Sequence, residues 1–170
     1  MIRFLLTAIC ALALNGCATT GSADRVKVVY SGLNFYIPTG VVAVGSVGGE
    51  QGFLAFKYST TPGEQFVAFS DESGIDNGGC GYSAFFQQVL ELSDKSTCDQ
   101  DAVNSFRIVF DVGSQSGVWQ GDQYQAYYFP GDDQKFFVFL VLDDSKAIKI
   151  DTDFLDKEQM RAIVAEQVSS

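Results

Sequence analysis

The sequence predicts a single α+β domain in which a mainly antiparallel sheet packs with one central helix and a C-terminal helix. Short runs of β-branched and aromatic residues, separated by turns that contain Gly or Pro, recur along most of the chain and predict strands. Two segments, one near the middle and one at the end, have helical spacing instead. The 170 residues are 46% hydrophobic and 19% charged, which is the composition of one globular domain.

Strand signals dominate the first half of the chain. Ser31-Gly32 and Thr61-Pro62-Gly63 are turn sequences, and each lies between two β-rich runs. A glycine-rich segment over 45–52 lacks the Lys and Ser/Thr of a phosphate-binding loop, so we interpret it as a link between strands. The strands predicted here cover residues 26–30, 33–37, 41–44, 53–58 and 66–70.

Three further strands are predicted in the second half. Residues 106–112 alternate between apolar and polar side chains, which is the period of a half-buried strand. Residues 118–129 form a long aromatic run. Residues 136–142 are apolar at every position, which predicts a central strand covered on both faces.

The two predicted helices have different signals. Residues 82–92 place their apolar side chains on one helical face. The last helix has a start signal, because Asp156 can cap it, Gln159 is the capping-box partner, and Leu155 can pack on Met160 as a hydrophobic staple. Its apolar face comprises Met160, Ile163, Val164 and Val168.

The first residues are typical of an export signal. Arg3 supplies a positive charge, and an apolar run over 4–14 is too short to span a bilayer as a helix. At the end of this run, Leu14-Asn15-Gly16-Cys17 resembles the lipobox of bacterial lipoproteins. The resemblance implies cleavage before Cys17 and attachment of several acyl chains, such as palmitate, to that residue. Ordinary signal-peptidase cleavage after Ala11-Leu12-Ala13 is the alternative.

The lipobox resemblance also implies boundaries and a location. Residues 1–16 are expected to form a cleaved signal peptide, 17–25 a lipidated cysteine and flexible tether, and 26–170 the globular domain. In Gram-negative lipoproteins an Asp after the cysteine favours retention in the inner membrane, and here the residue is Ala18. We therefore expect anchoring in the outer membrane, with the domain facing the periplasm.

Two cysteines remain in the exported domain. Cys10 is discarded with the signal and Cys17 carries the lipid, which leaves Cys80 and Cys98. Two cysteines in an exported domain predict one disulfide, and their separation does not match a redox motif. The bond would close a loop across the central helix.

Two stretches at the ends of the domain resemble the PsbP/Mog1-like fold. They are Asn34-Phe35-Tyr36-Ile37-Pro38-Thr39-Gly40 and Phe154-Leu155-Asp156-Lys157-Glu158-Gln159. The resemblance implies a sheet-and-helix domain of a group in which many members are accessory or binding proteins. It transfers no site residues to this chain.

Catalytic motifs are not found in the sequence. The chain has no histidine, which excludes Ser-His-Asp and Cys-His catalysis and removes the commonest metal ligand. Gly113 and Gly117 flank Gln115 where a nucleophile elbow would have Ser. We therefore predict no catalytic, cofactor-binding or metal-binding residues.

Acidic residues are abundant, and the formal net charge is −10. This charge disfavours binding to nucleic acids and direct contact with an anionic bilayer, so membrane attachment must come from the lipid on Cys17. We interpret most acidic residues as turn formers and a solvated surface rather than calcium ligands. The acidic pairs are Asp132/Asp133, Asp143/Asp144 and Asp151/Asp153.

These observations predict a non-enzymatic lipoprotein that binds or supports another, unidentified envelope component. One alternative is a binder of a lipid or other hydrophobic ligand between the sheet and the last helix. Another is a carboxylate-based hydrolase of envelope glycans. Four aromatic residues could line a groove or interaction face, although core packing is the simpler interpretation: Trp119, Tyr124, Tyr127 and Tyr128.

Overall fold

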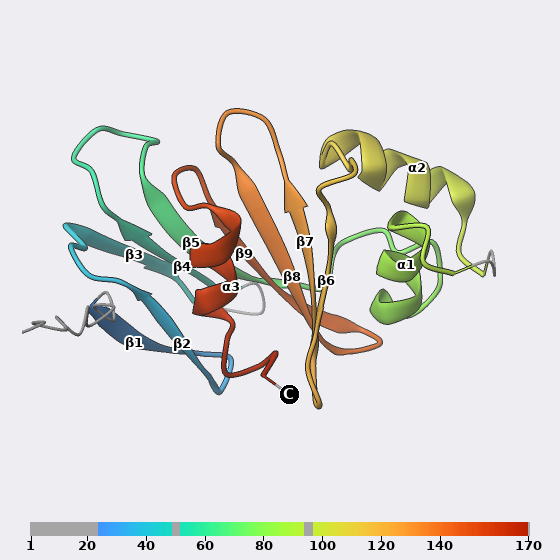
Figure 1. The fold of residues 1–170 in the computed structure, drawn as a ribbon, viewed down its shortest axis with the longest axis horizontal. Helices are drawn as coiled ribbons and strands as arrows, with labels where there is room; N and C mark the ends of the chain where they lie inside the picture. Colours follow the sequence, from blue (N-terminus) through green and yellow to red (C-terminus); the bar gives the residue numbers. More distant parts are fainter. Residues whose placement is uncertain (1–23, 49–51, 94–96, 170) are drawn as a thin grey trace, which may run out of the picture.

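The computed structural model describes residues 24–48, 52–93 and 97–169 (Figure 1). The expected signal peptide, the segment ending in Cys17 that resembles a lipobox, and the expected tether up to residue 23 lie outside the described residues. The described residues form an α+β domain whose strands all pair in antiparallel fashion. The predicted fold class is therefore confirmed.

Two sheets are present in the described ranges. A two-stranded sheet consists of β1 (Arg25–Tyr30) and β2 (Leu33–Pro38). The main sheet has the order β3-β4-β5-β9-β8-β7-β6. Its strands are β3 (Ala43–Val47), β4 (Phe53–Lys57), β5 (Phe66–Glu72), β6 (Gly117–Gln120), β7 (Gln125–Pro130), β8 (Phe136–Asp143) and β9 (Lys146–Thr152).

Each face of the main sheet has its own covering layer (Figure 1). On one face the β1–β2 hairpin and α3 (Lys157–Ile163) enclose a core that includes Phe35, Phe69 and Met160. On the other face α1 (Tyr82–Val89) and α2 (Gln100–Val109) cover β7 and β8. Strand β8 contributes alternate residues to both cores, so the predicted central strand covered on both faces is confirmed.

The prediction of a strand over 106–112 is wrong, because this segment belongs largely to helix α2. Asp99 caps the helix by accepting a hydrogen bond from the Asp101 amide at 2.8 Å. Phe106 packs in the core, whereas Ile108, two residues on, is 81% exposed. The alternation in the sequence therefore does not correspond to a buried and an exposed strand face, and the central helical region contains two helices.

Two other strand predictions need correction. The run over 118–129 is a hairpin of β6 and β7, and the Gly121 amide donates to the Tyr124 carbonyl in its turn. Strand β9 was not predicted, although Ile148 and Ile150 alternate with Lys149 and Asp151 as a half-buried strand requires. It pairs with both β5 and β8 and so joins the two halves of the sheet.

Two local predictions are confirmed. A disulfide joins Cys80 to Cys98 with 5.2 Å between their Cα atoms, and it links the segments that lead into α1 and α2. Helix α3 has the capping box, with Asp156 accepting from the Gln159 amide at 2.8 Å and Gln159 Oε1 accepting from the Asp156 amide at 3.0 Å. Leu155 and Met160 are both buried in the same core.

Candidate binding surface

Large apolar side chains are exposed at two ends of the domain. One group belongs to helix α2 and to the loop that follows α1: Leu92, Ile108 and Val109. The larger group belongs to β1, to β3 and the residue just before it, and to the start of β4. These three strands lie at the same end of the domain (Figure 1). It comprises Val26, Val29, Val42, Val44, Val47 and Phe53.

Strand β3 is the outer strand of the main sheet at this end. It pairs with β4 through five consecutive residue pairs without a register shift, and within the described residues no strand pairs with its other edge. All of its residues are exposed, and Val44 and Val47 are 60% and 64% exposed. The backbone N–H and C=O groups along a free edge are a template for another strand.

The β3 edge lacks the features that usually prevent strand addition. Edge strands are commonly interrupted by charged residues, proline or a bulge, or are very short. Strand β1, on whose outer edge no described strand pairs, carries Arg25 and Lys27, and β6 has only four residues. By contrast, residues 28–49 contain no charged side chain.

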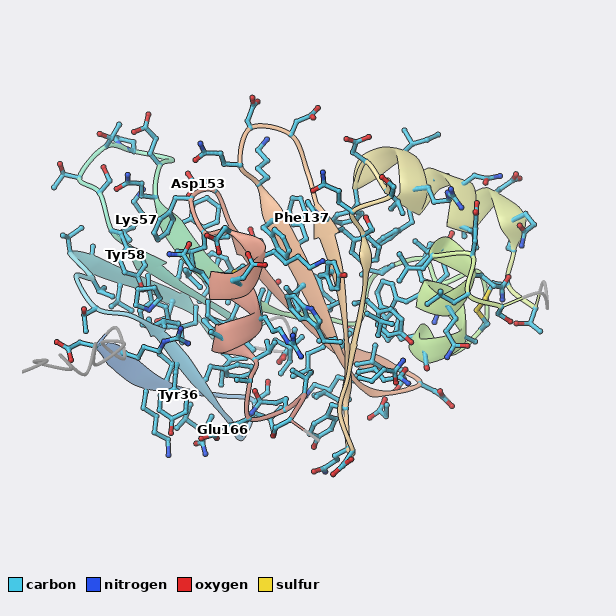
Figure 2. All side chains as sticks on the ribbon, in the orientation of Figure 1. Tyr36, Lys57, Tyr58, Phe137, Asp153 and Glu166 are labelled. Atoms are coloured by element: carbon cyan, nitrogen blue, oxygen red, sulfur yellow. A yellow bond between two sulfur atoms is a disulfide. The ribbon has the colours of Figure 1, made fainter. Side chains whose placement is uncertain are left out.

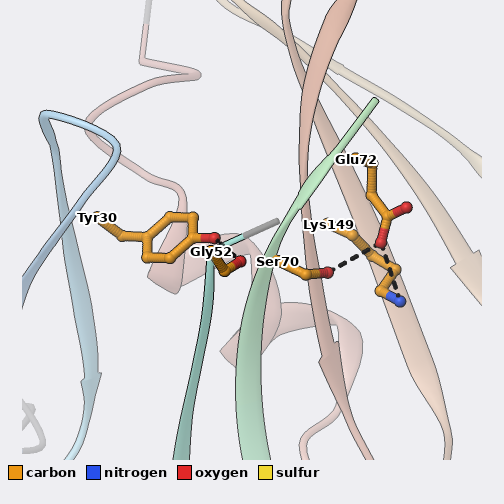
Figure 3. A network of polar contacts seen from close by, with 5 residues as sticks. All are labelled: Tyr30, Gly52, Ser70, Glu72 and Lys149. Carbon is orange, nitrogen blue, oxygen red and sulfur yellow. Dashed lines mark hydrogen bonds and ion pairs between the residues drawn. The ribbon is translucent and has the colours of Figure 1, made fainter. Parts of the chain in front are cut away.

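The β1–β2 hairpin supports this end of the sheet from one face. The Tyr30 ring lies 5.5 Å from the Phe69 ring, and its hydroxyl donates to the Gly52 carbonyl just before β4 (Figure 3). The Tyr58 hydroxyl donates to the Pro38 carbonyl at 2.9 Å, just after β4. Strand β4 is thus held near both of its ends, which fixes the position of β3 beside it.

Burial changes the acidity of both hydroxyl groups. Desolvation raises the pKa of Tyr30 to about 12, and the nearby Asp71 carboxylate adds to the effect. Desolvation likewise raises the pKa of Tyr58 to about 12. Both phenols therefore stay protonated and remain hydrogen-bond donors at neutral pH.

On the other face, a polar network lies on β5 and β9, beside the part covered by α1 and α2. The Ser70 hydroxyl donates to Glu72 at 2.9 Å, and the Lys149 ammonium pairs with the same carboxylate at 3.2 Å (Figure 3). Burial raises the pKa of the neighbouring Asp151 carboxyl. The positive charge of Lys149 opposes this rise, and the negative charge of Glu72 adds to it. Glu72 is thus engaged by two partners, which is the pattern of a structural ion pair.

The acidic pairs singled out in the sequence have turn and strand roles. Asp132 and Asp133 are exposed in the β7–β8 turn. Asp143 accepts hydrogen bonds from the backbone amide and hydroxyl of Ser145 at 2.8 and 2.9 Å, and these bonds lower its pKa. Asp144 is exposed in the same β8–β9 turn.

The third pair is split between two roles. Asp151 lies in strand β9, whereas Asp153 accepts from the backbone amides of Gln65 and Phe66 at 2.8 and 2.9 Å (Figure 2). Among residues 24–48, 52–93 and 97–169, no group of three Cys, Asp or Glu side chains is arranged to hold a metal ion.

Three of the four candidate aromatic residues are core residues. Trp119, Tyr127 and Tyr128 are at most 9% exposed, as the core-packing interpretation predicts. Tyr124 is half-buried and lines a hollow of about 300 Å³ beside Asn34 and Gln167. Strand β3 was not among the predicted functional residues, and its signal in the sequence is a long uncharged run of small and β-branched residues.

Comparisons with protein-family models, curated proteins and solved structures found no match to this chain. Within the part of the chain that the structure describes, no helix is long and apolar enough to cross a membrane.

Proposed function

We propose that this chain is a non-enzymatic lipoprotein of the bacterial outer membrane, attached through Cys17 and facing the periplasm. Its domain binds another envelope protein, and the partner adds an extended segment to the free edge of β3. The observation that carries this proposal is the uncharged, exposed and regular β3 edge.

Strand addition at β3 has a favourable energetic basis. Each backbone hydrogen bond formed there contributes about 1 kcal/mol net. A partner strand would also cover apolar side chains that are now in water, Val44 and Val47 among them. These two contributions are the usual basis of peptide recognition at a sheet edge.

The chemistry of this surface restricts the partner. A chain with a formal net charge of −10 repels acidic segments as they approach. The partner segment is therefore extended, rich in β-branched or aromatic residues, and free of Asp and Glu.

The anchor part of the proposal is supported by the sequence. Leu14-Asn15-Gly16-Cys17 ends an apolar run as a lipobox does. Several acyl chains on one residue give stable attachment, at roughly 0.8 kcal/mol for each buried CH₂. The acidic domain has no comparable source of membrane affinity.

A pair of matched substitutions tests the β3 proposal. Val44 on β3 and Val29 on β1 are 60% and 62% exposed, so Val44→Lys and Val29→Lys add the same charge at similar exposure. We expect one envelope protein to crosslink to the wild type and to Val29→Lys, and about tenfold less of it to Val44→Lys. The measurement is formaldehyde crosslinking in cells, affinity purification and mass spectrometry.

Three outcomes would contradict the proposal. Equal recovery of the partner with both variants would exclude β3 as the docking edge. Equal loss with both would indicate a general effect of added charge. Capture of a second copy of this chain in place of another protein would show self-association.

A further inference from the structure

A groove between the β7–β8 turn and the start of α3 is separate from the β3 edge. Its volume is about 660 Å³, within the range of small-molecule sites. Apolar side chains from both sides line it, namely Pro130, Phe136, Phe154 and Leu155. Phe136 and Leu155 are only 5% and 4% exposed, so Pro130 and Phe154 provide most of the apolar surface that a ligand can contact.

Two lysine residues line the same groove. They are Lys135, in the turn before β8, and Lys157, the first residue of α3. The Lys157 ammonium lies over the Tyr128 ring at 4.3 Å from its centroid. Within the described ranges neither ammonium forms an ion pair, whereas Lys149 and Arg107 each pair with a glutamate.

Two acidic residues also line the groove, and both oppose binding of an anion. Asp156 accepts a hydrogen bond from the Gln159 backbone amide at 2.8 Å and caps α3. Glu158 is exposed and also lines an adjacent hollow with Arg161. Glu158 can therefore be replaced without loss of the α3 cap, whereas Asp156 cannot.

We propose that this groove binds a small amphipathic anion. The apolar body of the ligand packs against Pro130 and Phe154, and its anionic group lies between Lys135 and Lys157. The charge on these two lysines selects the anion, and the apolar wall selects for a hydrophobic body. This site is independent of partner binding at β3.

The chain contains a natural reporter for the groove. Trp119 is its single tryptophan. The Trp119 ring stacks on the Tyr128 ring, with 4.5 Å between their centroids, and Tyr128 in turn contacts Lys157. The Trp119 ring also lies 6.5 Å from the ring of Phe136, which lines the groove. Energy transfer from Trp119 to a fluorescent probe therefore reports binding to the domain, and substitutions at the groove locate the bound probe.

The test titrates the purified domain with anilinonaphthalene sulfonate and with phenylnaphthylamine, which has the same rings without the sulfonate. We expect saturable energy transfer from Trp119 to the sulfonate probe, and roughly tenfold weaker binding of the uncharged probe. Lys157→Gln and Lys135→Gln should each weaken sulfonate binding by roughly fivefold, and Glu158→Gln should strengthen it by about twofold.

Two controls accompany these variants. Lys146→Gln removes a charge at the start of β9, away from the groove, and Val44→Lys changes only the β3 edge. Both should bind the probe as the wild type does, and thermal unfolding verifies that each variant is folded. Equal binding of the two probes, or unchanged binding in both groove lysine variants, would overturn the proposal whatever the result at β3.

Discussion

At the scale of single residues, two tyrosine hydroxyls connect the hairpin layer to the main sheet. The Tyr30 hydroxyl donates to the Gly52 carbonyl, and the Tyr58 hydroxyl donates to the Pro38 carbonyl. A phenolate has no proton to donate, so both hydrogen bonds are lost when the tyrosines ionise. Their pKa values, about 12 in the folded chain, exceed the value near 10 expected for unfolded tyrosine. Because of this difference, the free energy of unfolding of the domain depends on pH in the alkaline range.

The sign of this linkage follows from the raised pKa values. The folded state binds the phenolic protons more tightly, so the stabilisation is complete below about pH 10 and is lost as the pH rises towards about 12. We expect the free energy of unfolding, measured with urea, to fall over this interval. Burial also raises the pKa values of Tyr82 and Tyr127, which contribute in the same direction.

The double variant Tyr30→Phe/Tyr58→Phe separates these contributions. It should lose about 1 kcal/mol per hydrogen bond at pH 8. Its stability should then fall less steeply than that of the wild type between about pH 10 and 12. Parallel pH profiles for the two proteins would show that these two hydroxyls do not carry the linkage.

At the scale of secondary-structure elements, the disulfide and a buried glutamine hold α1 to the segment before α2. Gln88 is 8% exposed, and its amide nitrogen donates to the Thr97 hydroxyl at 2.8 Å. The Cys80–Cys98 bond joins residues 18 positions apart. Covalent and polar links therefore act together where the sequence is rich in loops.

Removing the disulfide tests the covalent part of this link. Cys80→Ser/Cys98→Ser should lower the free energy of unfolding by about 3 kcal/mol, the value for a loop of roughly this length in the chain-entropy model. Urea unfolding measures the loss, and mass spectrometry of the unreduced wild type should show the two cysteines linked. A variant as stable as the wild type, or two free thiols in the wild type, would refute this account.

Elements with strong local signals could be predicted from the sequence. Helix α3 has a complete capping box, and the apolar run of β8 requires cover on both faces. Helix α2 could not be assigned in this way, because Phe106, Ile108 and Phe110 fit strand alternation as well as a helix. The contact of Phe106 with Phe85 and Phe129, which favours the helix, depends on residues far along the chain.

The candidate binding surface was harder to predict than the fold. An extended segment near β3 was expected, but whether a strand lies at an edge depends on the order of all strands in the sheet. That order is set by β9, which pairs with β5 across about 80 residues of sequence. The groove beside α3 likewise brings together residues from two distant segments.

At the scale of the whole molecule, the described chain begins at the end that contains β3. Asp24 precedes β1, and its carbonyl accepts a hydrogen bond from the Thr39 amide (Figure 1). In the proposed anchor, a tether of the seven residues 18–24 would span about 15 Å. Attachment through Cys17 would therefore keep the β3 edge close to the membrane, where a membrane-associated partner can reach it.

The most direct test of this account is lipid labelling of the full chain in a Gram-negative host. We predict that the wild type incorporates labelled palmitate, that globomycin causes accumulation of the unprocessed form, and that both effects disappear in Cys17→Ser. The matched variant Cys10→Ser should behave as the wild type, because Cys10 lies in the segment that we propose is cleaved. Processing that is insensitive to globomycin, together with no palmitate on the wild type, would contradict the anchor and with it the proposed function.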